Sequence, residues 1–222
     1  MSGSFQNFIT DRSRLGVVLL LIVYLVGFAG TAFWDADAMM KLTPAILIFA
    51  VFLFFWNTPA VHTKYVIWFL GIAVTGYLIE LAGIRTGLIF GAYRYGSGLG
   101  VKLAGVPLII GLNWALLVFC ISALLSGINR SVWIRAALGA SLMVAFDLLL
   151  EPVAIRFDFW SWDLGFIPLQ NYLAWWLVSF CMFGGLLRSK LGLKNKMAGW
   201  ILGVQALFFL FLILLEGLRI GS

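Results

Sequence analysis

Carboxylic acids stand inside apolar runs of this chain, where their presence needs a chemical explanation. Glu80 lies near the end of one apolar run, and Asp147 and Glu151 lie near the end of another. Asp147 and Glu151 are four residues apart, a spacing that puts both side chains on one face of a helix. Two carboxyl groups that share an apolar site cannot both ionise easily, so one can act as a general acid beside an ionised general base. Carboxyl groups in a membrane interior are costly, and they therefore point to function.

Each of these acids also has a structural interpretation. Glu80 and Glu151 could be helix-end residues that reach the membrane surface, or ion-pair partners of Arg85 and Arg156. Asp147 fits this alternative least well, because it lies a turn deeper and has a shorter side chain.

Amides and aromatic rings accompany the acids. Asn113 and Trp114 lie within a further apolar run, and Asn171 begins another. A buried amide needs partners, so these amides could fix a water or a carboxyl group, or could make an interhelical hydrogen bond. Aromatic faces stabilise cations, although packing or an interfacial belt would explain the same rings. The aromatic candidates for a site, beside Trp114, are Tyr93, Tyr95, Trp160, Trp162 and Trp175.

Several kinds of cofactor chemistry lack the residues they need. The only histidine, His62, lies in a short loop, whereas a membrane di-iron enzyme needs many histidines. There is no CxxC pair for zinc or an iron–sulfur cluster, and no P-loop or GxGxxG motif for a nucleotide. We therefore expect no metal and no cofactor, and a redox-neutral acid–base reaction on a lipid or isoprenoid substrate.

The composition is that of a membrane protein. Of the 222 residues, 63% are hydrophobic and only 11% are charged, and the mean hydropathy is +1.06. A soluble domain is about a quarter charged. The net charge of +6 comes from basic residues at the ends of apolar runs, where topology explains them, so we expect no nucleic-acid partner.

The apolar runs predict an all-α polytopic membrane protein that forms one domain over residues 1–222. A bilayer span needs about 20 apolar residues. The predicted bundle has about seven transmembrane helices, at approximately residues 15–34, 42–56, 65–82, 106–125, 132–150, 172–187 and 198–218.

The charges predict an orientation. The N-terminus and the loops on its side hold nine of the fifteen basic residues and one of the nine acidic residues. The positive-inside rule therefore places the N-terminus in the cytoplasm of a protein of the cell (inner) membrane. With seven spans, the C-terminus lies outside.

Two connections on the predicted outer side are too apolar for plain solvent loops, so we expect both to be partly re-entrant or interfacial. In the first, from Ile84 to Gly105, we expect a short re-entrant or interfacial helix followed by a turn at residues 96–98. Glycines at every fourth position, 83, 87 and 91, favour close helix packing there. The second connection, from Glu151 to Asn171, carries Trp160 and Trp162 at a spacing typical of an interfacial belt.

These two outer segments resemble the membrane family of carotenoid biosynthesis that includes the γ-carotene and bisanhydrobacterioruberin hydratases. The resemblance covers about residues 76 to 176 and rests on the order and spacing of many residues of fixed type. Many relatives would carry an aspartate before the proline, where this chain has Glu151. The first block runs from Glu80 through Thr86, Phe90, Tyr93 and Tyr95 to Leu99-Gly100, Gly105-Val106-Pro107 and Trp114. The second comprises Asp147, Glu151-Pro152, Trp160-Ser161-Trp162, Ile167-Pro168, Asn171-Tyr172 and Trp175.

The resemblance implies a carotenoid hydratase whose partners are the carotenoid, water and the lipid bilayer, with other carotenoid-pathway enzymes as further potential partners. Asp147 or Glu151 would protonate the terminal acyclic double bond, and water held by Glu80 or Asn113 would add to the tertiary cation. Which carboxyl group is the acid and which is the base stays open. The implied catalytic residues are Asp147, Glu151 and Glu80, and the implied substrate-binding residues are Arg85, Thr86, Tyr93, Tyr95, Asn113, Trp114, Trp160, Trp162, Asn171 and Trp175.

Three alternatives share the same residues. A cyclase would use the same acid and aromatic rings without water and would give a ring. A prenyltransferase could hold a magnesium diphosphate on Asp147 and Glu151, but the chain has no matching second acidic motif. A non-enzymatic transporter would use the carboxyl groups as a proton or cation relay.

Overall fold

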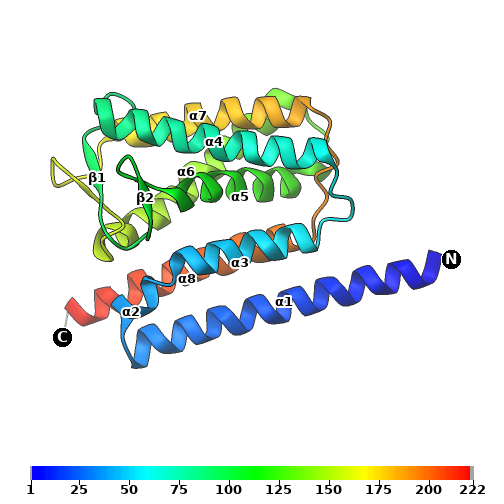
Figure 1. Ribbon diagram of the computed structural model, residues 1–222, viewed down its shortest axis with the longest axis horizontal. Helices are drawn as coiled ribbons and strands as arrows, with labels where there is room; N and C mark the ends of the chain where they lie inside the picture. Colours follow the sequence, from blue (N-terminus) through cyan, green and yellow to red (C-terminus); the bar gives the residue numbers. More distant parts are fainter. Residues whose placement is uncertain (1, 221–222) are drawn as a thin grey trace.

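The computed structural model describes the backbone of residues 2–220 and the side chains of residues 12–217, and this part of the chain is mostly helical. Figure 1 shows long helices lying side by side, with short strands at one end of the bundle. The helices are α1 (Ser2–Phe33), α2 (Ala36–Met40), α3 (Thr43–Trp56), α4 (Thr63–Thr86), α5 (Leu108–Leu124), α6 (Val132–Arg156), α7 (Leu169–Arg188) and α8 (Met197–Ile220), with a 3₁₀ turn η1 (Leu125–Gly127) after α5.

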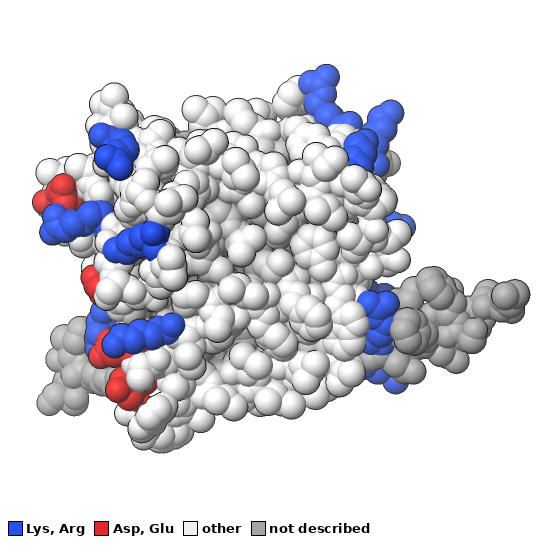
Figure 2. Space-filling model, in the orientation of Figure 1, with Lys and Arg blue, Asp and Glu red and all other residues white. Residues whose placement is uncertain are grey.

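The chain is a helical membrane protein. Among the described residues, α1, α4, α5, α6 and α8 are long and apolar enough to cross a bilayer, and α3 is a shorter apolar helix. Figure 2 shows lysine and arginine at the two ends of the molecule with an uncharged band between them, as a bilayer requires. Each of the seven predicted spans coincides with a helix. That α3 and α7 cross the membrane stays a prediction, because α3 is short and the first turn of α7 contains Gln170 and Asn171.

Helix α5 forms the centre of the bundle. Its residues from Trp114 to Ala123 are all buried, and it contacts α3, α4, α6, α7 and α8. Helix α4 packs mainly on α5, and α7 packs mainly on α6. Because no other helix has so little lipid-facing surface, α5 provides the fixed wall against which a site can be built.

The prediction of a short re-entrant or interfacial helix between Ile84 and Gly105 is wrong. Helix α4 ends at Thr86, and Gly87 closes it with a left-handed backbone (φ +65°) and a bond from its N–H to the Gly83 carbonyl. The chain then forms β1 (Tyr93–Tyr95), β2 (Lys102–Leu103) and β3 (Val106–Pro107), with a turn near the predicted place at residues 97–100. The glycine spacing marks a helix end and a loop, because Gly91 also has a positive φ (+107°), which no helix accepts.

The predicted end of the fifth span at residue 150 is also too early. Helix α6 continues through Pro152 to Arg156. A proline in a transmembrane helix is tolerated where neighbouring structure satisfies the freed carbonyl groups. Glu151 therefore lies within the helix and not at its end, and it is buried.

A short antiparallel pairing joins the connection that follows α4 to the connection that follows α6. Strand β4 (Trp160–Trp162) pairs with β1, so that Tyr93 lies opposite Trp162 and Tyr95 opposite Trp160. Side chains alternate between the two faces of a strand, and all four rings turn to the inner face. Arg94, on the outer face between the two tyrosines, forms an ion pair of 2.9 Å with Asp163.

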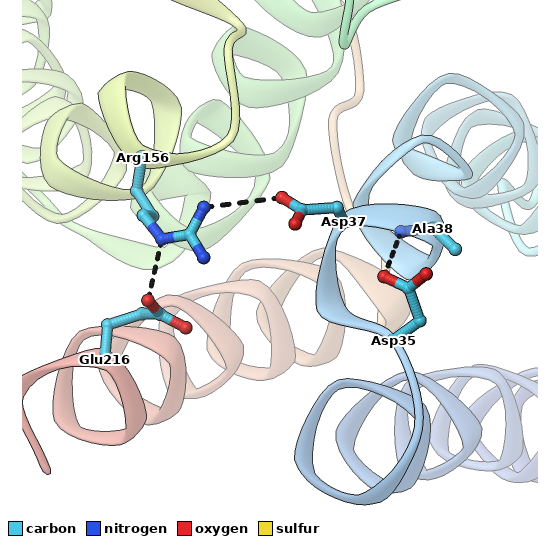
Figure 3. Close-up of polar contacts among 5 residues, drawn as sticks. All are labelled: Asp35, Asp37, Ala38, Arg156 and Glu216. Carbon is cyan, nitrogen blue, oxygen red and sulfur yellow. Dashed lines mark hydrogen bonds and ion pairs between the residues drawn. The ribbon is translucent and has the colours of Figure 1, made fainter. Parts of the chain in front are cut away.

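A second cluster of ion pairs connects three helices at the same end of the bundle. Arg156 of α6 forms ion pairs with Glu216 of α8, at 2.7 Å, and with Asp37 of α2, at 3.4 Å (Figure 3). Asp35 caps α2 by accepting a hydrogen bond from the Ala38 N–H (Figure 3). Arg156 is thus occupied outside the bundle interior and is not the partner of Glu151.

Candidate active site

Three neutral donors hold the carboxyl group of Glu80. The hydroxyl groups of Tyr93 and Tyr95 both donate to Oε2, the second at 2.7 Å, and the indole of Trp114 donates to Oε1 at 3.0 Å. Glu80 is 4% exposed, and none of the ion pairs among the described residues involves it. The surface interpretation of Glu80, as a helix-end residue or a partner of Arg85, is therefore wrong.

Glu151 and Asp147 share one amide. Nδ2 of Asn171 donates to Oδ2 of Asp147 at 2.9 Å and to Oε1 of Glu151 at 3.1 Å. The indoles of Trp160 and Trp162 each donate to Oε2 of Glu151 at 3.0 Å. Asp147 and Glu151 are 0% and 1% exposed, so these side chains do not reach the surface either.

One oxygen of Asp147 stands apart from this network. Its Oδ1 is buried and has no hydrogen-bond partner among the described residues. An ionised oxygen in such a place is costly unless a donor reaches it. Asp147 is therefore the least satisfied of the three carboxyl groups.

The β1–β4 pairing explains how the donors reach two carboxyl groups at once. The register places the tyrosines of β1 beside Glu80 of α4 and the tryptophans of β4 beside Glu151 of α6. Burial and the neighbouring Glu80 raise the pKa of the Tyr93 and Tyr95 hydroxyl groups, so both stay protonated donors. The small sheet thus connects the C-terminal end of α4 to the C-terminal end of α6.

The carboxyl groups of Glu80 and Glu151 face one small cavity of about 30 Å³. That is room for about two waters. Aromatic rings surround it, and those of Tyr93 and Trp162 lie 5.2 Å apart. Its lining consists of Glu80, Phe90, Tyr93, Tyr95, Ile110, Asn113, Trp114, Leu150, Glu151, Trp160, Trp162, Asn171 and Trp175.

A stacked pair of indoles forms part of the cavity wall. The rings of Trp114 and Trp175 lie 4.2 Å apart at an angle of 23°. Trp114 comes this close to α4 only because residue 76 is glycine, since a Cβ there would lie 2.7 Å from the indole. The glycine in α4, four residues before Glu80, therefore helps to set the position of the Trp114 donor.

Ten of the thirteen site residues that the resemblance implies line this cavity. Asp147 lies behind Asn171 and does not line the cavity. Arg85 and Thr86 lie outside it: both are exposed, and Thr86 donates to the Ala82 carbonyl at the end of α4. Substrate binding by Arg85 and Thr86 therefore stays a prediction, for a part of the substrate outside this cavity.

Three apolar residues of the lining were not expected, namely Phe90, Ile110 and Leu150. Phe90 stands in the block that carries the resemblance, so its position offered a signal. Ile110 and Leu150 offered none, because they are ordinary members of apolar runs. Among the described residues, no group of three or more histidines, cysteines, aspartates or glutamates is placed to hold a metal ion.

Known proteins resemble this chain over most of its length. Residues 42–219 match the family described as carotenoid biosynthesis protein, a longer match than the central segment predicted from the motifs. The bisanhydrobacterioruberin hydratase of Haloarcula japonica is 27% identical over 194 residues, which cover 79% of this chain and 64% of the relative. The chain thus spans a little under two-thirds of the length of this curated relative. No solved structure matches the chain.

Proposed function

Because the chain belongs to the carotenoid biosynthesis protein family, we propose that it is a hydratase that adds water to the terminal acyclic double bond of a carotenoid. The observation that carries the proposal is the pair of glutamates, Glu80 and Glu151, facing one aromatic cavity inside a membrane bundle. The name of the relative, a hydratase, supports the same reaction class. Hydration of an isolated double bond needs an acid, a base, water and a way to stabilise a cation.

We assign the acid to the side of the cavity formed by α6. Glu151 contacts the cavity and Asp147 does not, so Glu151 would donate the proton to the double bond. Asp147 and Glu151 accept hydrogen bonds from the same Asn171 nitrogen, and repulsion between two ionised groups would keep one proton in this pair. Asp147 is then a positioning residue that controls the proton of Glu151.

Glu80 would complete the reaction from the opposite wall. Protonation gives a tertiary cation, which the faces of the surrounding tyrosines and tryptophans would stabilise. Water adds to the cation, and Glu80 would accept the proton that the bound water loses. The net change is one alkene and one water converted into one tertiary alcohol, with the proton count of the carboxyl groups unchanged.

Only the end of a carotenoid could enter this site, and the lining side chains must move apart to admit it, since the cavity holds only about two waters. We place the rest of the polyene in an apolar groove of about 660 Å³ between α4 and α7. The α4 wall of the groove, from Ile67 to Ile79, is about 18 Å long and ends next to Glu80. The α7 wall begins at Leu177, two residues beyond Trp175.

The decisive experiment is expression in cells that accumulate an acyclic carotenoid, with the pigments analysed by mass. A gain of one water for each reacted end supports the hydratase. A ring-containing product of unchanged mass would identify a cyclase instead. Unchanged pigment from well-folded, membrane-inserted protein would overturn the proposal, and activity of purified protein without any gradient would exclude a transporter as the explanation.

A further inference from the structure

A second cavity, of about 40 Å³, adjoins the one that contains the glutamates. The two cavities share four lining residues, Ile110, Asn113, Leu150 and Trp160. The second cavity lies among α3, α5, α6 and α8, whereas α4 and α7 border only the first. At about 10–15 Å³ per water, it has room for about three waters.

Polar side chains line the second cavity although it lies inside the bundle. Gln205 of α8 lines it, and this side chain is 3% exposed. The Oε1 atom of Gln205 is buried and has no hydrogen-bond donor among the described residues. A buried amide oxygen without a donor is costly, so such groups are normally bonded to a protein donor or to a water.

Two further polar groups face the same space. Thr43 of α3 donates its hydroxyl proton to the Met40 carbonyl at 2.6 Å, which leaves the hydroxyl oxygen able to accept. Asn113 lines both cavities, so its amide can contact a water in either one. A water in the second cavity therefore has the two to four polar partners that a buried water needs.

We propose that this second cavity holds the water that adds to the substrate, with Gln205 and Asn113 as its positioning residues. The inference rests on the proposed hydratase function. Amide oxygens accept the hydrogens of the water and thereby turn its lone pair toward the glutamate cavity, where the cation forms. The new C–O bond forms between this oxygen and the tertiary carbon, and the released proton passes to Glu80.

Loss of this water site has a consequence that a general loss of structure does not have. Protonation of the double bond is reversible, and a cation that finds no water returns a proton from a neighbouring carbon to the carboxylate. In D₂O the acid carries deuterium, so a return that removes a hydrogen in place of the added deuteron leaves deuterium in the recovered alkene. The ratio of deuterium exchange to alcohol formation therefore measures how well water is supplied once the cation exists.

The test compares purified wild-type protein with Gln205→Met and Asn113→Leu, each incubated with an acyclic carotenoid in D₂O. We expect each variant to raise the ratio of exchange to hydration at least tenfold, while Gln205→Glu, which keeps an acceptor, stays near the wild-type ratio. Ser122→Ala is the matched control, because Ser122 is another buried polar side chain without a hydrogen-bond partner among the described residues, and it lines neither cavity.

The outcomes separate the two proposals. Alcohol from the wild type with an unchanged ratio in both Gln205→Met and Asn113→Leu would overturn the water site and leave the hydratase standing, even if the variants were slower overall. Absence of alcohol from folded wild-type protein would overturn the hydratase itself. An equal rise of the ratio in Ser122→Ala would show a general effect of buried polar groups and would also overturn the inference.

Discussion

Indole, phenol and amide groups supply the hydrogen bonds that the three buried carboxyl groups accept from described residues. This choice of donor matters for proton transfer. An arginine or lysine partner would hold a carboxyl group in its ionised form. Neutral donors orient the group but leave it able to gain and lose a proton, which a general acid and a general base must both do.

The first prediction concerns the proposed acid. Glu151→Gln keeps the size of the side chain but cannot donate a carboxyl proton, so we expect hydration to fall by about 10²- to 10⁴-fold. Alcohol formation by purified protein is the measurement. Asp163→Asn is the control, because Asp163 undergoes the same chemical change in an ion pair outside the cavity. Activity of Glu151→Gln within a few-fold of the control would remove Glu151 from the mechanism.

The second prediction concerns Asp147, which lies behind the cavity. Asp147→Asn retains an oxygen that can accept from Asn171 but removes the charge that competes with Glu151 for a proton. We expect loss of product with normal amounts of protein in the membrane, measured by pigment analysis and by immunoblot of membrane fractions. Full activity of this variant would show that the Asp147 carboxyl group has no role in catalysis.

The third prediction concerns Asp158, outside the membrane spans. The backbone N–H and hydroxyl of Ser97 donate to its carboxylate at 2.7 and 2.8 Å and hold the pKa of Asp158 below its ordinary value. Since the folded-state pKa is the lower one, the stabilisation is complete above the unfolded pKa of about 3.9 and is lost as the pH falls through the folded value.

Asp158→Asn should therefore lower the melting temperature at pH 7, and the difference from wild type should shrink as the pH is lowered toward 3. Thermal unfolding in detergent across this range is the measurement. Ser97→Ala should reproduce part of the effect, because it removes one of the two donors. A difference of constant size over the whole range would contradict the argument.

At the scale of elements, the site depends on which pairs of helices pack against each other and which pairs leave a space between them. Helix α4 packs on α5 and α7 packs on α6, and the space left between α4 and α7 is the apolar groove. The β1–β4 pairing then joins the connections that follow α4 and α6. As a result, the donors of β1 reach Glu80 and the donors of β4 reach Glu151. One pairing register therefore controls two hydrogen-bond clusters.

The fourth prediction tests the groove as the place of the polyene. Gly71 of α4 faces the groove, and a Cβ there would meet no atom within 4 Å, so Gly71→Trp should fold and project its ring into the groove. We expect at least a tenfold loss of activity on a full-length carotenoid and little change on a short isoprenoid with the same end group. Both rates are measured by product mass.

Gly203→Trp of α8 is the matched control, because a Cβ at Gly203 also meets no atom within 4 Å and Gly203 does not line the groove. It should leave both rates near those of the wild type. Equal behaviour of the two variants on the long substrate would place the polyene elsewhere, without affecting the assignment of the carboxyl groups.

At the scale of the whole molecule, the candidate site lies at the end of the bundle where the strands lie and where α1 leads into α2 (Figure 1). On the face shown in Figure 2, the acidic residues also gather at that end, while both ends carry basic residues. The ion pairs of Arg156 fasten α2, α6 and α8 there (Figure 3). We propose, from the charge asymmetry, that this end lies outside and that the N-terminus lies in the cytoplasm.

The fifth prediction tests this orientation and the crossing by α7 together. Leu164 precedes α7 and Lys194 follows it, and both are exposed. In a Cys181→Ser background, which leaves only the buried Cys120, a membrane-impermeant thiol reagent on intact cells should label Leu164→Cys and not Lys194→Cys. The reverse pattern would invert the topology, and equal labelling of both would show that α7 does not cross.

The sequence by itself determined the membrane class, the approximate positions of the helices and most of the candidate residues. It could do so because a lipid-facing helix must be apolar along its whole length, and because a carboxyl group in such a run is too costly to be there by chance. The same reasoning placed Asp147 and Glu151 on one helix face, since that relation depends only on local geometry.

The tertiary structure alone decided how these residues meet. The β1–β4 register, the sharing of Asn171 by two carboxyl groups and the exclusion of Arg85 and Thr86 all depend on contacts between segments far apart in the chain. The cavity lined by Gln205 also depends on them, because α8 brings this amide beside Asn113 of α5. Composition and periodicity report which face of an element is apolar, but only packing decides which faces touch.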